Sequence, residues 1–339
     1  MKVKIIVLLL ILVLAITVIH NRELIQYGWW QGKGQLAILW NAQPIESLLD
    51  NPDIADSLKQ KLRLLENIKS YGQSIGLSVN ESYNTVYDQK GQPILWNVSA
   101  CLPYSFESYQ WHFPFLGSLA YKGFFELEKA KNLVKELGDQ GWDVNIRTVG
   151  AWSTLGWFDD PLMSNQLFRS EGALAETVLH ELTHATLFYP DSLDFNENLA
   201  SFIGKEAAIR FITIQYGEQS QQLRQFLSEE TDAAYFRTHM LRGKQALDSL
   251  YESFPPDLSE QNKEILKTSK IQEIIDNLDT LDFKDERYNS IFEVGSLPNN
   301  AYFMGFNRYY SKQDSFKKTL DSLNGDLKAW IHEHKNHMN

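Results

Sequence analysis

The sequence predicts an α+β fold in which helices predominate and a small β-sheet lies beside a central helix. Apolar residues recur at every third or fourth position over 53–75 and through most of the chain beyond residue 205, a pattern typical of amphipathic helices. Residues 78–101 contain many β-branched and aromatic residues, and 144–149 alternates like a strand. With 339 residues, 43% of them hydrophobic, the chain can bury a large core.

The first half of the chain mixes helices with short extended segments. A glycine and a proline interrupt 78–101, so we expect a hairpin or short strands there. The segment 101–122, rich in proline, glycine and aromatic residues, is expected to be an ordered loop. A helix over 124–137 precedes the predicted strand 144–149, and an aromatic loop over 150–169 follows it.

The second half is expected to be mostly helical. The predicted helices are 205–216, 219–227, 230–253, 259–278 and 312–335. We expect one domain over 23–339, with an α/β part over about 23–160, site helices over about 170–216 and a helical C-terminal part over about 217–339.

Charge and cysteine content restrict the classes of partner. The net charge is −11 and the pI about 5.3, with no cluster of lysine and arginine that could bind phosphates, so no nucleic-acid partner is expected. Cys101 is the single cysteine, which rules out a disulfide within the chain.

The N-terminus has the pattern of an export signal. Lys2 and Lys4 precede an apolar run over 5–19, and polar residues follow it. No small-x-small cleavage site follows closely, so residues 1–22 are expected to form an uncleaved signal anchor. The chain would then be membrane-anchored and extracytoplasmic, in the periplasm or cell envelope. The alternative is a cleaved signal peptide and a secreted protein.

The most specific motif is His-Glu-Leu-Thr-His at 180–184. It lies in a predicted helix that begins near Ser170 and runs to Tyr189, before a proline. Two histidines four apart lie on one helical face, so His180 and His184 can bind a single Zn²⁺. Glu181 projects over the open coordination position, where it can accept a proton from a water at the metal.

A zinc site of this type needs a third protein ligand. Leu187 and Pro190 stand where one zinc-peptidase lineage has glycine and histidine, so the ligand must lie farther along the chain. Glu197, thirteen positions after His184, is the best candidate, and Asp191 and Asp194 are alternatives. Asp194 and Glu197 also resemble a capping box, with Asp194 at the N-cap.

The residues after Glu197 favour the ligand interpretation. Small residues share its helical face and would let a second helix pack closely on the first. They are Ala200, Ser201, Gly204 and Ala208. Glu206 points to the opposite side of this helix.

Substrate contacts are less well defined. The predicted strand 144–149 is a candidate for pairing with an extended peptide substrate beside the site. A donor to the tetrahedral oxyanion is also required, and the sequence leaves several candidates open. These are Tyr302, Tyr309, Tyr310, Arg308 and His239.

The chain resembles the bacterial "putative aminopeptidase" family of exported proteins, whose members pair the gluzincin-type H-E-x-x-H with N-E-x-x-A. The likeness covers most of residues 27–316. It rests on the two metal motifs and on Gly34-Gln35-Leu36, Trp111-His112-Phe113-Pro114 with Gly117, Tyr121-Lys122-Gly123, Ser153-Thr154-Leu155-Gly156-Trp157-Phe158, Asp160-Pro161-Leu162 and Asn299-Asn300-Ala301.

This resemblance implies a zincin-like fold, one Zn²⁺ per chain, ligands His180, His184 and Glu197, and catalytic Glu181. It also implies that the segments around 153–162 and 299–300 border the site. The candidate substrate-binding residues are therefore Ser153, Thr154, Asn299, Asn300 and Tyr309. Many relatives look like lipoproteins, whereas this chain has no lipid-accepting cysteine after its apolar run. It also lacks the Gly-x-Met-Glu-Asn segment of well-known zinc aminopeptidases.

The predicted function is zinc-dependent hydrolysis of peptide bonds in a peptide or protein substrate, by an exported or membrane-anchored (amino)peptidase. The alternative is a catalytically silent metal-containing binding or scaffold protein at the cell envelope. The presence of Glu181 favours the enzyme, because a purely structural metal site has no need of that carboxylate.

Overall fold

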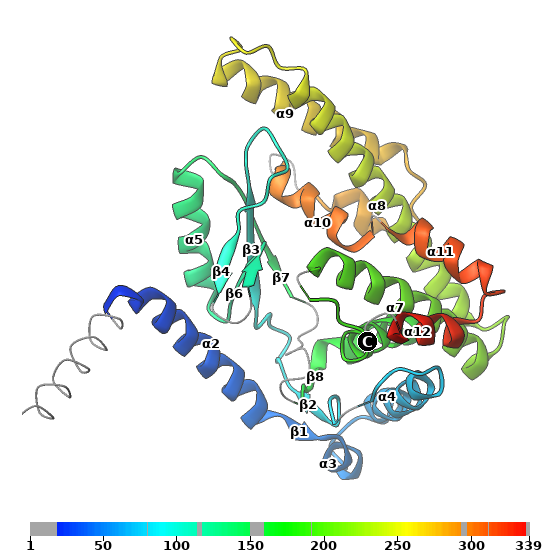
Figure 1. The fold of residues 1–339 in the computed structure, drawn as a ribbon. Coiled ribbons are helices and arrows are strands. Elements are labelled where there is room, and N and C mark those ends of the chain that lie inside the picture. The colour runs from blue at the N-terminus through cyan, green and yellow to red at the C-terminus, as the bar shows by residue number, and fades with distance from the viewer. Residues whose placement is uncertain are drawn as a thin grey trace, which may run out of the picture.

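The computed structural model, drawn in Figure 1, describes residues 19–79, 81–113, 117–149, 159–190, 192–292, 297–310 and 312–336. The elements of the first half are α2 (Arg22–Asn41), β1 (Gln43–Pro44), α3 (Ile45–Asp50), α4 (Asp56–Ser74), β2 (Thr85–Tyr87), β3 (Trp96–Cys101), β4 (Trp111–Phe113), β5 (Gly117–Leu119), β6 (Lys122–Phe124), α5 (Leu127–Asp139), β7 (Asp143–Thr148) and β8 (Leu162–Met163). Those of the second half are the 3₁₀ turn η1 (Ser164–Phe168), α6 (Glu171–His184), α7 (Leu193–Tyr216), α8 (Gln221–Glu252), α9 (Glu260–Asp276), η2 (Asn277–Thr280), η3 (Glu286–Ser290), α10 (Asn300–Tyr310), α11 (Gln313–Ser322) and α12 (Leu327–Asn336).

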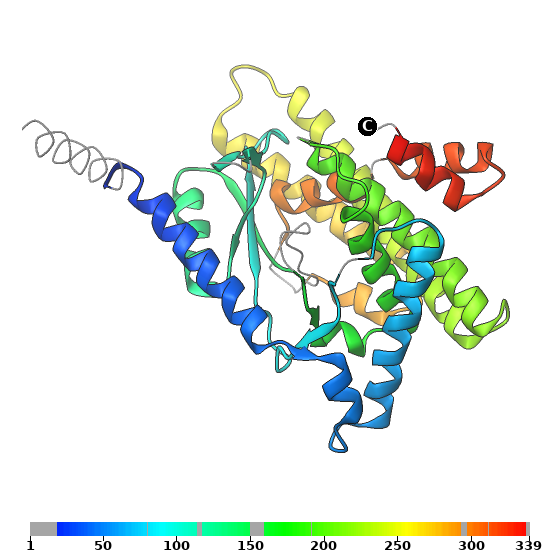
Figure 2. The same ribbon diagram turned by 60° about the horizontal axis from the view of Figure 1, so that its bottom comes forward.

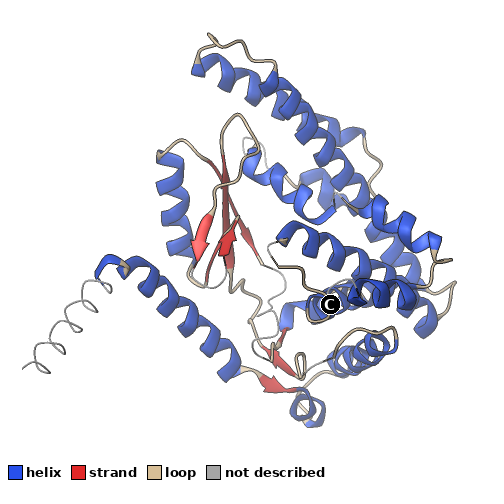
Figure 3. Cartoon of the chain, in the orientation of Figure 1, coloured by secondary structure: helices blue, strands red, loops and turns tan. Residues whose placement is uncertain are grey.

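The predicted α+β class with a helical majority is confirmed (Figure 3). Among the described residues, the strands form small sheets in the orders β1-β2-β8, β6-β3-β7 and β4-β5. The predicted helix over 53–75 is α4, and the predicted strand 144–149 is β7, which pairs antiparallel with β3. α10 packs against both β7 and α7, so it connects the sheet that contains β7 to the second site helix.

Several element boundaries differ from the prediction for identifiable reasons. The segment 101–122 contains the hairpin β4–β5 rather than only a loop. The predicted helices 219–227 and 230–253 are one helix, α8, because no glycine or proline separates them. The predicted helix 312–335 is divided into α11 and α12, since Asn324 and Gly325 adopt positive φ angles of 54° and 74°. α10 is an additional helix.

Two apolar cores hold the helices together. The larger core joins α4, α6 and α7 to α11 and α12, and its largest buried side chain is Trp330. The second core joins the C-terminal half of α8 to α9 and α10 around Phe303. Gly243 lies where these three helices meet, because a Cβ there would come within 2.8 Å of Ile274 and 3.1 Å of Phe303.

The first helix, α2, lies along the outer flank of the molecule beside the β6-β3-β7 sheet (Figures 1 and 2). In the part of the chain that the structure describes, every helix is too short or too polar to cross a bilayer. The apolar run predicted to be a signal anchor, 5–19, lies almost entirely outside the described residues.

Candidate metal centre

The first site helix, α6, is defined by a capped start and an early end. Ser170 caps it, accepting a hydrogen bond from the Ala173 N–H at 3.2 Å while donating one to Glu229 at 2.7 Å. The helix ends at His184, five residues before the predicted end at Tyr189. The Leu187 N–H still bonds the Thr183 carbonyl at 2.7 Å, and the chain then turns away. His184 therefore lies in the last turn rather than in the middle of the helix.

The second site helix, α7, begins one turn before Glu197. Ser192 stands at its N-cap without a side-chain cap bond, so the prediction of Asp194 as the N-cap is wrong. Asp194 is exposed in the first turn, and Asp191 lies outside the described residues. Asn196 instead fixes the loop between the helices, because its amide both accepts from the Tyr189 N–H at 2.9 Å and donates to the Tyr189 carbonyl at 2.8 Å.

Close packing of α6 on α7 depends on a glycine. A Cβ at Gly204 would lie 2.9 Å from the Glu176 carbonyl oxygen and 3.1 Å from Cβ of His180. The predicted small-residue face is thus the contact surface between the two helices, where Ala200 and Ala208 are fully buried. This packing brings the first turn of α7 opposite the last turn of α6.

The three predicted metal ligands come together at this point. Nε2 of His180 and Nε2 of His184 are 3.1 Å apart, and Oε2 of Glu197 lies 3.6 Å from the first and 3.8 Å from the second. Tetrahedral zinc with bonds of about 2.0–2.1 Å separates its ligand atoms by about 3.3–3.4 Å. In the described part of the chain, these three are the histidine, cysteine and acidic side chains that lie close enough together to hold a metal ion.

The electrostatics of the trio favour a cation. Burial alone would raise the pKa of Glu197, but the polar ring nitrogens and charge of the adjacent His180 and His184 hold that pKa well below its usual range. Burial lowers the pKa of His184, yet the adjacent carboxylate of Glu197 and the charge of Glu181 raise it above the ordinary value of 6.5. Glu197 is therefore ionised and needs a positive partner, which a metal ion or a protonated histidine can supply.

His184 is the more deeply buried imidazole of the trio. His184 is 8% exposed, and its Nδ1 has no hydrogen-bond partner among the described residues. A neutral imidazole ligating through Nε2 carries its proton on Nδ1. The donor set of two imidazoles and one carboxylate is typical of catalytic zinc sites that leave a fourth position open.

Tyr83 is a buried residue near the site that sequence reasoning missed. Burial and the charges of Glu181 and Asp160 raise its pKa well above the usual value, so its hydroxyl remains a proton donor. Its φ angle of 63° is rare for an aromatic residue. Hydrogen bonds impose this backbone conformation, because Tyr83 N–H donates to the Asp160 carbonyl at 2.7 Å and Asp160 N–H donates to Ser82 Oγ at 3.1 Å. Only the Asp160-Pro turn signalled special geometry there.

The predicted substrate-binding asparagines lie in a structural network. Asn300 is fully buried: its side chain accepts from the Tyr251 hydroxyl at 2.7 Å and donates to the Pro103 carbonyl at 2.9 Å. Its N–H donates to Asp143, which is also paired with Lys267 at 2.8 Å. Asn299 donates to the Val144 carbonyl at 2.8 Å. The amide of Asn300 is thus occupied by protein partners, which leaves it no group for substrate.

The remaining candidates are located as follows. Ser153 and Thr154 lie outside the described residues. The described part of α10 contains the backbone of Tyr309, and its side chain is not among those described. His239 bonds the Ile274 carbonyl at 2.6 Å, and Tyr302 packs in the second core.

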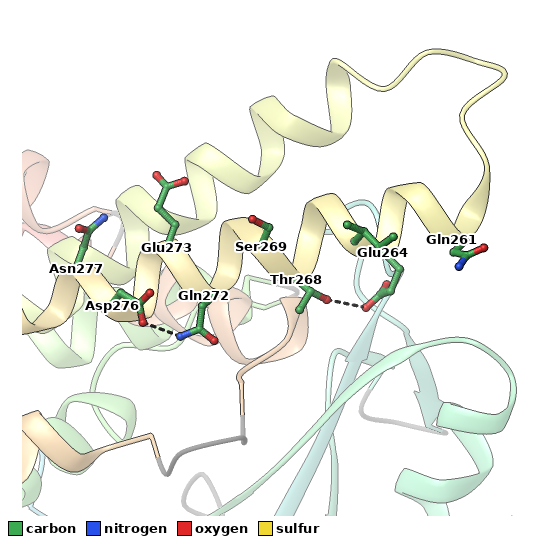
Figure 4. Close-up of a pocket in the computed structure, with 9 residues that line it drawn as sticks. Gln261, Glu264, Thr268, Ser269, Gln272, Glu273, Asp276 and Asn277 are labelled. Carbon is green, nitrogen blue, oxygen red and sulfur yellow. Dashed lines mark hydrogen bonds between the residues drawn. The ribbon is translucent and has the colours of Figure 1, made fainter.

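An open hollow on another part of the surface is separate from this centre. It runs along α9 and is lined by polar residues of that helix and its end, among them Glu264, Gln272 and Asp276 (Figure 4). Gln272 donates to Asp276 at 2.6 Å, one turn along the same helix. Its lining comes from one exposed face, whereas the metal centre lies between α6 and α7.

Comparison with known proteins identifies the family of the chain. A model of the family described as "Putative aminopeptidase" matches residues 26–339, which include α6, α7 and every other element after the start of α2. Among curated proteins and solved structures, none matches the chain. The family description places the protein among peptidases at the level of enzyme class. Because this match covers nearly the full length of the chain, the protein belongs to the "putative aminopeptidase" family.

Proposed function

We propose that the chain is a zinc-dependent peptidase of the gluzincin type with a zincin-like fold. The observation that carries this proposal is the trio His180, His184 and Glu197, whose ligating atoms lie 3.1–3.8 Å apart. This spacing and donor set suit one Zn²⁺ per chain with an open position for water and substrate.

The chain's own residues supply the proton transfers. A zinc ion held by His180, His184 and Glu197 would supply Lewis acidity, which lowers the pKa of a water and polarises a carbonyl. Glu181, next to His180 on α6 and partly exposed, accepts the proton of that water and delivers it to the leaving amine. Tyr83 is a candidate for positioning this carboxylate, because it is buried, stays protonated and is close enough for the charge of Glu181 to raise its pKa.

The outer edge of β7 provides a place for the substrate backbone. Val149 N–H bonds the Leu95 carbonyl, which makes these residues a hydrogen-bonded pair, so alternate residues of β7 turn their backbone groups away from β3. On that outer edge the Val144 carbonyl is taken by Asn299. Ile146 and Thr148 have no strand partner there among the described residues, and an extended peptide can pair with them.

The decisive experiment compares Glu181→Gln with the wild type and with Glu206→Gln as a matched control. Glu206 lies on α7 beside Arg210 and outside the trio. We expect Glu181→Gln to bind zinc normally and to lose turnover of a peptide library by about 10²-fold or more. We expect Glu206→Gln to retain both properties. Zinc binding without any Glu181-dependent cleavage would favour the alternative, a catalytically silent binding or scaffold protein.

The third ligand is tested separately by metal analysis. Glu197→Ala should lower zinc affinity strongly, because a single carboxylate supplies one of the three protein ligands. The same substitution at Asp194, which is exposed one turn earlier, should leave zinc content unchanged. Full zinc occupancy in Glu197→Ala would show that another residue ligates the metal.

The proposed location is extracytoplasmic, with the chain anchored to the membrane by residues 1–22. Lys2, Lys4 and the apolar run over 5–19 support it. N-terminal sequencing of the exported protein tests this point: an intact Met1 indicates an anchor, and a start after the apolar run indicates a cleaved signal peptide.

A further inference from the structure

The helix α2 has apolar side chains on two opposite sides. One side faces the body of the protein: Tyr27 donates to the Gly123 carbonyl at 2.9 Å, Gly34 lies against the ring of Phe125, and Ile38 is 2% exposed. At about 100° per residue, these positions fall on a single face. The contacts of α2 with the body of the protein are therefore made by one side of the helix, and the opposite side takes no part in them.

The other side is exposed and equally apolar. It contains Ile25, Trp29, Leu36 and Trp40, whose exposed fractions are 48%, 72%, 60% and 89%. With Gly32, these residues lie within a sector of about 80°, centred roughly opposite the side that packs on the body. We call this set the outer face of α2. Both views of the fold place α2 on the flank of the molecule (Figures 1 and 2).

The charges around the outer face identify the kind of surface that it fits. The chain carries a net charge of −11, yet the acidic residue of α2, Glu23, lies away from the outer face. Arg22 and Lys33, both exposed, border the face on the side of the two tryptophans. A second copy docked through the same face would bring these two cations against themselves, with no acid on the face to pair with them. Anionic lipid headgroups would pair with both.

The position of α2 in the chain supports the same occupant. The apolar run over 5–19 ends three residues before α2 begins, so a bilayer that takes up this run lies next to the helix. Tryptophan is enriched where a bilayer meets water, and eleven residues of helix separate Trp29 from Trp40 by about 16 Å along the axis. Both indoles can therefore reach the same interface only if the helix lies along it.

We propose that α2 lies flat on the surface of an anionic bilayer, with the outer face in the interface and Arg22 and Lys33 at the headgroups. The body of the protein, including the metal centre, is then held on the far side of α2. The inference does not depend on the chemistry at the metal, and it adds a second attachment to the proposed anchor.

A fluorescence experiment on the full chain tests this orientation. A cysteine replaces Gly32, which is exposed on the outer face with no atom within 4 Å of an added Cβ, and carries an environment-sensitive dye. The matched control is Gly138→Cys, also exposed, helical and without neighbours, on α5. Cys101 is fully buried, and burial together with the charge of Asp143 raises its pKa to about 12, so it does not react at neutral pH.

Both labelled proteins are reconstituted in vesicles of phosphatidylcholine and phosphatidylglycerol that contain brominated lipid. We expect the dye at position 32 to be quenched several-fold more than the dye at 138, at one protein per vesicle. Replacing Trp29 and Trp40 with serine should reduce this quenching to the level of the control, while zinc content stays unchanged.

Three outcomes would overturn the proposal. If the protein floats with vesicles but both dyes are quenched equally, the anchor stands and the outer face does not touch lipid. If the dye at 32 is shielded only at high protein-to-lipid ratio, the occupant is a second copy. If the protein does not float with vesicles, neither attachment exists.

Discussion

Replacing Gly204 with alanine tests whether close helix packing sets the metal geometry. A Cβ at this position would lie 2.9 Å from the Glu176 carbonyl oxygen, and 3.1 and 3.2 Å from Cβ and N of His180. An ordinary contact begins at 3.4 Å, so the first distance must lengthen by 0.5 Å. The atoms in the way belong to the backbone of α6 and to the base of a ligand. They cannot rotate aside, so the two helices must separate.

The size of the effect follows from a comparison with Gly28→Ala. Gly28 is also inside a helix, but no atom lies within 4 Å of an added Cβ. Both substitutions gain about 1 kcal/mol of helix propensity, so the difference in stability between them isolates the overpacking cost of about 1–3 kcal/mol. A shift of 0.5 Å also exceeds the tolerance of about 0.2 Å in metal–ligand distances. We therefore expect zinc affinity to fall by about 10-fold or more.

Two measurements check this reasoning. Chemical denaturation of the metal-free proteins gives the difference in the free energy of unfolding, and competition with a chelator gives the zinc affinity. A Gly204→Ala protein as stable as Gly28→Ala, with unchanged zinc affinity, would mean that α6 and α7 do not approach as described. Lower stability with unchanged affinity would show that the trio adjusts independently of helix packing.

The remaining predictions concern protons, positioning, the buried network and the metal. In the metal-free protein, the pKa of Glu197 is lower in the folded than in the unfolded state, so this group stabilises the fold fully above pH 4.5. The pKa of His184 is raised on folding, so this group stabilises the fold fully below pH 6.5. The free energy of unfolding, measured by urea titration, should therefore gain most from this pair between these two pH values. Zinc affinity should fall as pH falls, because protons compete for the imidazoles. Tyr83→Phe should lower kcat by about 10-fold with little change in KM or zinc content, and an unchanged kcat would remove Tyr83 from the mechanism. Asn300→Ala should lower the free energy of unfolding in denaturant by about 2–4 kcal/mol without loss of zinc, because it leaves the buried Tyr251 hydroxyl and Pro103 carbonyl without their hydrogen-bond partner. Chelation should lower Tm but leave far-UV circular dichroism unchanged, since apolar packing forms both site helices.

The clustering of His180, His184 and Glu197 was predictable from local rules. Helical spacing places His180 and His184 on one face, and small residues after Glu197 indicate a close partner helix. Each rule depends on a few neighbouring residues and on the sterics of one helix pair. The structure brings together the predicted side chains at 3.1–3.8 Å.

Features that depend on distant parts of the chain were not predictable in this way. The end of α6 at His184 depends on a turn whose geometry Asn196 completes from the next helix. The role of Asn300 depends on Tyr251 and Pro103, which are 49 and 197 positions away. Tyr83 has a left-handed backbone conformation, and its N–H bonds the carbonyl of Asp160, which lies 77 positions away in the chain. Periodicity carries no information about such pairings.

The arrangement of His180, His184 and Glu197 is therefore a product of apolar packing. The contact surface of α6 and α7 is lined with alanine and glycine, and the outer sides of both helices are buried in the larger core. Asn196 also fixes the loop between the helices, so the first turn of α7 is held in place relative to His184. With both helices held in this way, packing alone directs the carboxylate of Glu197 towards the two imidazoles. If the trio binds zinc as proposed, little of the metal's binding free energy is needed to order its ligands, and more of it remains to hold the ion.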